Sequence, residues 1–309
     1  MEDFVKEKKI LDDIQSAGVK NDHLIRHLAF CDEVHCLVFP WADGGDLGQF
    51  WQRKCSRTTD DFLWSLGQLA GLASALEDLH KVNCRHGDLK PANILYFTEK
   101  SVGILKIADF GISRVHTIAT GLRNGVTITS HSTRGYEGPE TLEVYKKQWA
   151  RSRLYDCWSM GCIILEFVVW LLYDFKALES FVGFRDPPDL GYYRHLKYNL
   201  ENGESREEAV VHPYVDKAMI CLREDQRCKG TALEALVNTV DNDLLKIDPK
   251  QRLPAADLHR RLRMIFEDAQ KDPSYVVNVD VPRQVTPYIF SQEPLSDSSP
   301  KSTYQKSTS

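Results

Sequence analysis

One apolar run, MGCIILEFVVWLLY at residues 160–173, constrains the fold of this 309-residue chain more than any other stretch. A single acid, Glu166, interrupts the run. The run is also shorter than the ~20 residues that a membrane-spanning helix needs. We therefore expect a helix buried in a protein core, and no membrane partner. A hydrophobic content of 42% and a charged content of 27% are ordinary for a soluble globular protein, which agrees with this interpretation.

The apolar pattern elsewhere predicts both helices and strands. Apolar residues recur at helical spacing over 60–81, with Thr58, Thr59 or Asp60 available as the N-cap. The same spacing predicts an amphipathic helix over 3–17. Strands are predicted over 23–30, 35–41, 94–97 and 104–107. The chain from about 151 to about 270 is predicted to be mostly helical, and the polar tail from 283 to be disordered.

Charge and cysteine content narrow the partners and the compartment. The net charge of −5 gives no sign of a nucleic-acid partner, for which a basic face would be typical. The eight cysteines include no Cys-x-x-Cys pair, so reduced thiols in the cytoplasm, or alternatively in the nucleus, are expected. Cys31, His35 and Cys36 form one local cluster. A zinc site needs about four ligands, so a plain β-hairpin is the favoured interpretation.

A series of polar motifs carries the chemistry. Asp88 and Asn93 stand five residues apart in HGDLKPAN, and Asp109 of ADFG follows sixteen residues after Asn93. Three further motifs come next in order, GPE at 138–140, DCWSMG at 156–161 and DPKQR at 248–252. The series resembles the eukaryotic protein kinase family, whose signatures include H-R-D-L-x-x-x-N, D-F-G and A-P-E. The resemblance implies an α+β bilobal fold with a small β lobe and a mainly helical large lobe.

The resemblance implies a catalytic role for four of these residues. Asp88 would accept the proton of a substrate hydroxyl, and Lys90 would steady the negative charge of the transferred phosphate. Asn93 and Asp109 would hold Mg²⁺, which prefers hard oxygen ligands, against the phosphates of ATP. Asp-x-Lys in this loop, together with Thr133, is the serine/threonine form of the family. The implied partner is therefore a protein substrate that presents serine or threonine.

Other matches imply structural or nucleotide-binding roles. His86 and Asp156 resemble residues that anchor the catalytic loop, and Glu140 and Arg252 resemble a long-range ion pair of the large lobe. LVFPWADGGDL at 37–47 resembles the hinge between the lobes. The ATP-binding residues implied there are Phe39 as gatekeeper, the backbone around Pro40, Trp41 and Ala42, and Asp46, toward the ribose or a basic substrate. A simple interlobe linker is the alternative for Asp46.

Two departures from the family pattern stand out. Gly87 occupies the place of an arginine that would bind a phosphate on the activation segment, so activity is expected not to need phosphorylation of residues 113–133. The Gly-rich loop and the strand with the ATP-binding lysine are both missing, because only six residues precede Glu7, the predicted partner of that lysine. A truncated small lobe is therefore expected, with weaker nucleotide binding.

Three regions are predicted along the chain. Residues 1–40 would be the remnant of the small lobe, with Glu7 directed toward ATP, residues 41–272 the large lobe, and residues 273–309 a disordered tail. The missing strands would leave apolar surface and a sheet edge exposed, and such surfaces invite association with another chain.

Three functions remain open from the sequence. The first is a serine/threonine protein kinase-like enzyme that uses ATP and Mg²⁺ and is truncated at its N-terminus. The second is a pseudokinase that binds partners through its large lobe, which the missing phosphate clamp favours. The third is a small-molecule kinase of the aminoglycoside or choline type, which also carries H-G-D-x-x-x-x-N. Such enzymes are not expected to combine that loop with DFG, a Pro-Glu segment and DxWSxG.

Overall fold

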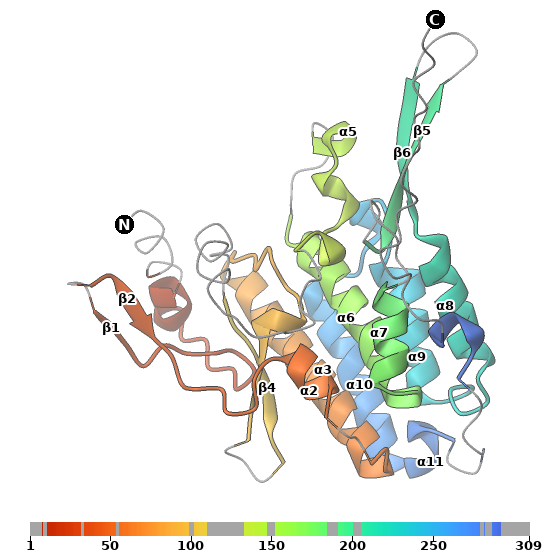
Figure 1. The fold of residues 1–309 in the computed structure, drawn as a ribbon. Coiled ribbons are helices and arrows are strands. Elements are labelled where there is room, and N and C mark those ends of the chain that lie inside the picture. Colours follow the sequence, from red (N-terminus) through yellow and green to blue (C-terminus); the bar gives the residue numbers. More distant parts are fainter. Residues whose placement is uncertain are drawn as a thin grey trace, which may run out of the picture.

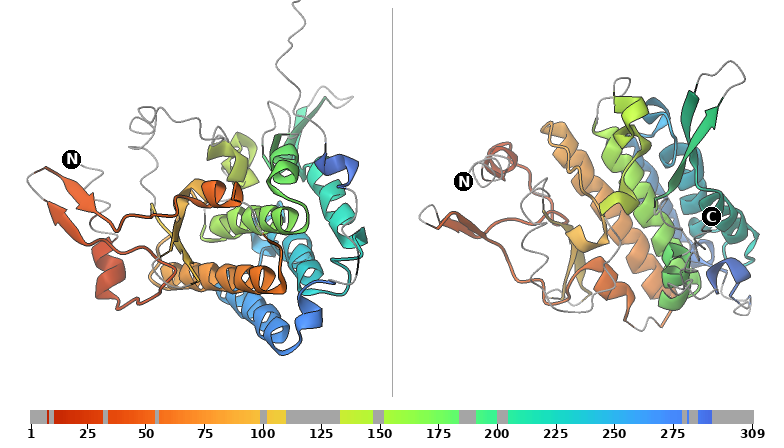
Figure 2. Two further views of the ribbon diagram at one scale, coloured as in Figure 1. Left: turned by 60° about the horizontal axis from the view of Figure 1, so that its bottom comes forward. Right: turned by 45° about the horizontal axis from the view of Figure 1, so that its top comes forward.

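The computed structural model describes residues 8, 11–31, 34–53, 56–98, 102–109, 133–146, 152–183, 191–199, 205–278, 281 and 286–291. A short helical segment and a small sheet near the N-terminus lie to one side of a larger, mainly helical body (Figure 1). Two further views show the same separation (Figure 2). The described strands form three two-stranded sheets. The predicted α+β class, with few strands and many helices, is confirmed.

The N-terminal side consists of one helical segment and one hairpin. Residues 11–16 are helical, and Leu11 and Ile14 are buried, as the apolar spacing predicts. Strand β1 (Ala29–Cys31) pairs antiparallel with β2 (Cys36–Val38), which confirms the hairpin predicted around the cysteine cluster. Both strands are shorter than predicted.

A second hairpin joins this side to the helical body. Strand β3 (Ile94–Phe97) pairs antiparallel with β4 (Ile104–Ile107), at the bounds predicted from the sequence. The segment around Leu24, predicted as part of a strand, forms only an isolated parallel bridge to Ile107. The amide of Ile25 donates to the carbonyl of Ile107 (2.9 Å), and the amide of Ile107 donates to the carbonyl of His23 (2.8 Å). The N-terminal segment is therefore hydrogen-bonded to the strand that leads to Asp109.

Helix α6 (Leu154–Leu172) forms the centre of the helical body. Among the described residues it is the one helix long and apolar enough by composition to cross a membrane. However, 94% of its most apolar window is buried inside the protein. Every residue from Tyr155 to Leu172 is buried. The core helix predicted from the apolar run is therefore confirmed.

The other helices surround α6. Helix α3 (Thr59–Lys81) packs along α10 (Ala255–Lys271) and also contacts α6. The remaining α-helices are α2 (Leu47–Trp51), α5 (Glu143–Lys146), α7 (Phe175–Gly183), α8 (Pro213–Glu224), α9 (Ala232–Thr239) and α11 (Pro273–Val276). Short helical turns are η1 (Pro91–Asn93), η3 (Thr133–Tyr136), η4 (Pro139–Thr141), η5 (Val240–Leu244), η6 (Pro249–Gln251) and η7 (Tyr288–Phe290).

The region from about 151 to about 270 is mostly helical, as predicted. Its one described departure into strand structure is an antiparallel hairpin of β5 (Tyr193–Asn199) and β6 (Ser205–Val211), which extends from the body (Figure 1). The predicted disordered tail is partly ordered. Val276 of α11 and Phe290 of η7 are buried, and the ring of Phe290 contacts that of Tyr173 at a centroid distance of 5.0 Å. Apolar contacts of these two side chains therefore hold both segments against the body, although the sequence on either side is mostly polar. Residues 292–309 lie outside the described part.

Candidate active site

The loop that begins at His86 is held by the first turn of the core helix. Asp156 of α6 is fully buried, and its carboxylate accepts hydrogen bonds from the amides of His86 (2.9 Å) and Gly87 (2.8 Å). The ring Nε2 of His80, on α3, lies 2.8 Å from the same carboxylate. A buried carboxylate must be hydrogen-bonded to be tolerated, so these partners account for Asp156 in the core. They also fix the backbone of the loop.

The buried ring of His86 links this loop to the strand before Asp109. Its Nδ1 accepts from the amide of Asp88 (3.2 Å), so Nε2 is the nitrogen that carries the proton and donates to the carbonyl of Ala108 (2.9 Å). The amide of Ala108 in turn donates to the carbonyl of Asn93 (2.9 Å). The two predicted metal ligands, Asn93 and Asp109, are therefore brought together by backbone contacts.

Three of the predicted catalytic residues form one polar cluster. The ammonium of Lys90 lies 2.7 Å from Oδ2 of Asp88. The amide nitrogen of Asn93 donates to the carbonyl of Asp88 (2.8 Å) and approaches its Oδ2 (3.2 Å). Asp88 and Asn93 are both buried, and the carboxylate of Asp88 faces a cation and an amide donor. Because the nitrogen of Asn93 is engaged in this way, the amide oxygen is its available ligand atom.

Asp109 differs from the other acids of the site. Its backbone has φ = 67°, a left-handed conformation that is uncommon for a residue other than glycine. Its Oδ1 is buried and has no hydrogen-bond partner among the residues that the structure describes. An unsatisfied buried acceptor is destabilising, and a bound cation would remove that cost. Asp109 and Asn93 together offer hard oxygen donors of the kind that Mg²⁺ prefers, so these residues fit the implied metal.

The predicted hinge residues lie between β2 and α2. Phe39, Pro40 and Ala42 are half-buried, whereas the side chain of Trp41 is 85% exposed. The sequence interpretation assigns the backbone of Trp41, not this side chain, to a contact with the nucleotide, and that role stays a prediction. The side chain of Asp46 already caps α2 by accepting from the amide of Gln49 (2.8 Å).

The surroundings of Asp46 shift its ionisation. Burial raises the pKa of its carboxyl, and the amides of Gln49 and Gly48 only partly offset this effect. Its assigned role toward the ribose stays a prediction. Glu7 and the side chain of Thr133 lie outside the described residues, so neither is placed in the site.

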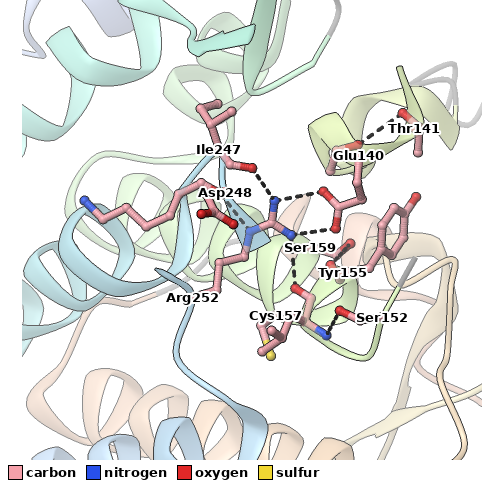
Figure 3. Close-up of polar contacts among 12 residues, drawn as sticks. Glu140, Thr141, Ser152, Tyr155, Cys157, Ser159, Ile247, Asp248 and Arg252 are labelled. Carbon is pink, nitrogen blue, oxygen red and sulfur yellow. Dashed lines mark hydrogen bonds and ion pairs between the residues drawn. The ribbon is translucent and has the colours of Figure 1, made fainter. Parts of the chain in front are cut away.

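Glu140 and Arg252 form a buried ion pair across the large helical body (Figure 3). The two guanidinium nitrogens meet the two carboxylate oxygens at 2.7 and 2.8 Å, and both side chains are fully buried. Arg252 also donates to the carbonyls of Lys246 (2.8 Å) and Leu154 (3.2 Å). The pair therefore joins the segment that contains GPE to the start of α6 and to the chain before α10.

The structure adds a buried cluster that the motifs do not reveal. Glu166 accepts hydrogen bonds from the hydroxyls of Tyr136 (2.9 Å) and Tyr192 (2.8 Å). The hydroxyl of Ser159 donates to the carbonyl of Tyr136 (2.9 Å). This cluster fixes the segment just before Glu140 against α6. The one signal for it in the sequence is the single acid inside the apolar run.

Comparisons with known proteins agree with this geometry. Residues 2–175, more than half of the chain, match the family model described as "Protein kinase domain". Mitogen-activated protein kinase kinase 2 of Arabidopsis thaliana is 35% identical over 206 residues, which cover 59% of this chain and 52% of that protein. Mitogen-activated protein kinase 7 of the same plant is 28% identical over 264 residues, or 79% of this chain and 62% of that protein.

A probable myosin light chain kinase of Dictyostelium discoideum is 33% identical over 135 residues, which cover 43% of this chain and 25% of that protein. The chain thus spans less than two thirds of the length of each of these relatives. The family model covers the catalytic loop, the DFG motif, GPE and the anchoring aspartate. The chain belongs to the eukaryotic protein kinase family.

Proposed function

We propose that the chain is a serine/threonine protein kinase-like domain, which transfers the γ-phosphate of ATP to a protein hydroxyl. The observation that carries this proposal is the buried Oδ1 of Asp109, which has no hydrogen-bond partner among the described residues. The preceding residue, Ala108, is hydrogen-bonded to Asn93 of the cluster that also holds Asp88 and Lys90. This arrangement provides a base, a cation and two oxygen ligands in one place. Phosphoryl transfer needs mainly such positioning and charge neutralisation.

Each residue of the site has a role that follows from its chemical type. The carboxylate of Asp88 accepts the proton of the substrate serine or threonine hydroxyl, which makes the oxygen a better nucleophile. Lys90, held at 2.7 Å from Asp88, supplies positive charge where the transferred phosphate accumulates negative charge. Asn93 and Asp109 would hold Mg²⁺, which neutralises phosphate oxygens when bound. The anchors at Asp156 and His86 keep these groups in place between turnovers.

Nucleotide binding is tested first. The melting temperature of the chain is measured with ATP at millimolar concentration, with Mg²⁺ and again with EDTA. Wild type should gain stability only when both ATP and Mg²⁺ are present, because a ligand that binds the folded state stabilises it. Asp109→Asn should lose that gain, and Asp13→Asn, at an exposed position on the N-terminal helical segment, should keep it. No gain in wild type would end the claim of an ATP site.

Transfer is tested separately, because a pseudokinase that binds partners is the competing function. Radiolabelled phosphate incorporation into a serine/threonine peptide mixture is compared between wild type and Asp88→Asn. Loss of a general base should lower the rate by about 10²–10⁴-fold while the nucleotide-dependent stabilisation persists. A wild type that binds ATP and Mg²⁺ but transfers no phosphate would favour the pseudokinase.

An exposed apolar surface supports the pseudokinase alternative, in addition to the missing phosphate clamp. Large apolar side chains are exposed on and around the β1–β2 hairpin, at Leu28, Phe30, Val34, Val38 and Trp41. Exposed apolar patches often mark interaction sites, so we propose association of this surface with another protein chain. Sedimentation velocity over a range of concentrations should show self-association that Val34→Ser weakens. A monomer at every concentration would exclude a second copy as the partner.

The cytoplasm, or the nucleus, is the proposed compartment of the protein.

A further inference from the structure

Two thiols face each other across the β1–β2 hairpin. In the register of this sheet Cys31 is paired directly with Cys36, next to the pair of Phe30 with Leu37. Directly opposed residues of an antiparallel pair project their side chains from the same face of the sheet. Both cysteines are free thiols in this structure.

The backbone spacing of such a pair is that of a disulfide. Opposed Cα atoms in antiparallel strands lie ~4.5 or ~5.5 Å apart, depending on the type of pair. Both values fall within the ~4.4–6.8 Å found across disulfides. A bond between the sulfurs of Cys31 and Cys36 therefore requires side-chain rotation and little backbone movement. No group of three or more potential metal ligands exists among the described residues, so a shared metal does not explain the pairing.

Cys36 is the one exposed cysteine among those that the structure describes. Cys31 is partly exposed, as are Cys84 and Cys221, whereas Cys157, Cys162 and Cys228 are buried. Neither Cys84 nor Cys221 lies opposite a second cysteine in a described sheet. Burial raises the pKa of the Cys157 thiol to about 12, and burial likewise raises that of Cys84 to about 11. Thiols with such high pKa values hold almost no reactive thiolate near neutral pH. An oxidant in solution therefore finds Cys36 exposed and directly opposite a second thiol, whereas Cys157 is buried and Cys84 holds little thiolate.

We propose that Cys31 and Cys36 form an oxidant-dependent intramolecular disulfide at the end of the hairpin that leads into the hinge. Hydrogen peroxide is the oxidant. The sulfur of Cys36 attacks one peroxide oxygen, the O–O bond breaks, and the chain gains a sulfenic acid while water leaves. The sulfur of Cys31 then attacks the sulfur of Cys36, the S–O bond breaks, and a second water leaves. Two thiols and one peroxide thus give one disulfide and two waters.

The sequence allows a direct test of this bond. No lysine or arginine lies between Arg26 and Arg53, so trypsin releases both cysteines in one peptide, 27–53. Cleavage after Glu33 with a glutamate-specific protease then separates Cys31 from Cys36. After brief peroxide treatment and alkylation of free thiols, the two fragments should remain linked until a reductant is added. The mass of the linked fragments should be lower than the summed mass of the two reduced fragments by two hydrogen atoms.

Matched variants make the test specific. Cys31→Ser and Cys36→Ser should each abolish the linked fragment, and Cys84→Ser should leave it unchanged. In the double variant Cys36→Ser, Leu37→Cys the second thiol moves to the other face of the sheet, because side chains alternate along a strand. Its intramolecular yield should fall to near zero, because the effective concentration of two groups is near zero where geometry keeps them from meeting.

Two outcomes would overturn the proposal. One is that Cys31 and Cys36 remain alkylatable, or proceed to separate sulfinic acids, while other thiols are consumed. The other is that the fragments are linked only between two chains, seen as a covalent dimer whose yield rises with protein concentration. Because the readout is the mass of two fragments, it is independent of nucleotide binding and of phosphate transfer.

Discussion

At the scale of the residue, Gly87 shows how backbone conformation and loop anchoring coincide. Its φ is 79°, in the region that favours glycine, and its amide donates to Asp156. A Cβ at this position would lie 3.4 Å from Nε of Arg85, which is ordinary van der Waals contact. There is thus room for a methyl group, and a residue with a Cβ is disfavoured here by the left-handed backbone conformation. The backbone conformation at this position therefore favours glycine, independently of any phosphate on the activation segment.

The first prediction concerns this position. Gly87→Ala should lower the free energy of unfolding by about 1–2 kcal/mol, the cost of a left-handed residue with a Cβ. Urea denaturation followed by fluorescence measures the change. Gly230→Ala is the matched control, since Gly230 has φ = 73° and open space around it. Both variants should lose similar stability, and only Gly87→Ala should also weaken the stabilisation by ATP and Mg²⁺. A loss of stability in Gly87→Ala much larger than in the control would mean that steric crowding, not backbone strain, decides this position.

Individual site residues were predictable from the sequence only where they belong to a motif. The spacing of Asp88, Asn93 and Asp109 led to the polar cluster, because that spacing is part of a resemblance. The partners of Glu166 were not predictable in this way. Tyr136 and Tyr192 lie 30 and 26 residues from Glu166, and only folding brings their hydroxyls to the carboxylate.

At the scale of the element, apolar periodicity predicted the helices that pack on one face, but it did not predict the projecting β5–β6 hairpin. The bounds of α3 follow from its apolar spacing. The β5–β6 hairpin carries mostly polar residues, so its period is weak. Tertiary contacts hold it instead, among them the amide of Ala209, which donates to the hydroxyl of Tyr145 (2.9 Å).

The second prediction decides between caps that the sequence left open for α3. The hydroxyl of Thr58 accepts from the amide of Asp61 (3.2 Å), and the amide of Thr58 donates to the carboxylate of Asp61 (2.9 Å). Thr58→Ala should therefore lower the free energy of unfolding by about 1 kcal/mol. Thr59→Ala, inside the first turn, serves as the control and should change it by less than half as much. An equal loss in both variants, measured by urea denaturation, would show that the capping box does not form.

At the scale of the whole molecule, buried ion pairs join segments that are distant in the chain. Glu140 and Arg252 are separated by 112 residues and meet with both side chains fully buried. Arg227 pairs with Asp225 and also donates to the carbonyl of Leu172 at the end of α6 (2.6 Å). The first pair was implied by the family resemblance. The second belongs to no motif, and the sequence offered no means to predict it.

The third prediction tests the long-range pair. Glu140→Ala leaves the guanidinium of Arg252 buried without its carboxylate, which should lower the free energy of unfolding by about 3–5 kcal/mol. The double variant Glu140→Ala, Arg252→Met removes both charges. It should be more stable than Glu140→Ala, since an apolar replacement of a buried pair costs much less than a broken one. Urea denaturation of both variants and the wild type provides the comparison. A double variant that is less stable than Glu140→Ala would contradict this account.

The last prediction follows from the second pair. Burial opposes ionisation of Asp225, but hydrogen bonds from Arg227 and Tyr173 outweigh that effect and lower the pKa of the carboxyl below its ordinary value of 3.8. A carboxyl whose pKa is depressed in the folded state contributes stability above its unfolded pKa. That contribution is lost as the pH falls through the folded value. The contribution of Asp225 should therefore be constant from neutral pH down to its unfolded pKa and should decline in more acidic solution.

Urea denaturation at a series of pH values from about 7 to about 3 measures this dependence. Asp225→Asn should be less stable than wild type at neutral pH, because Arg227 then lacks its counter-charge. It should also lose less stability than wild type in the acidic range, so the two curves converge as the pH falls. Asp13→Asn, at an exposed position, should run parallel to wild type. Parallel curves for Asp225→Asn and wild type would contradict the depressed pKa of Asp225, because the carboxyl would then titrate alike in the folded and unfolded states.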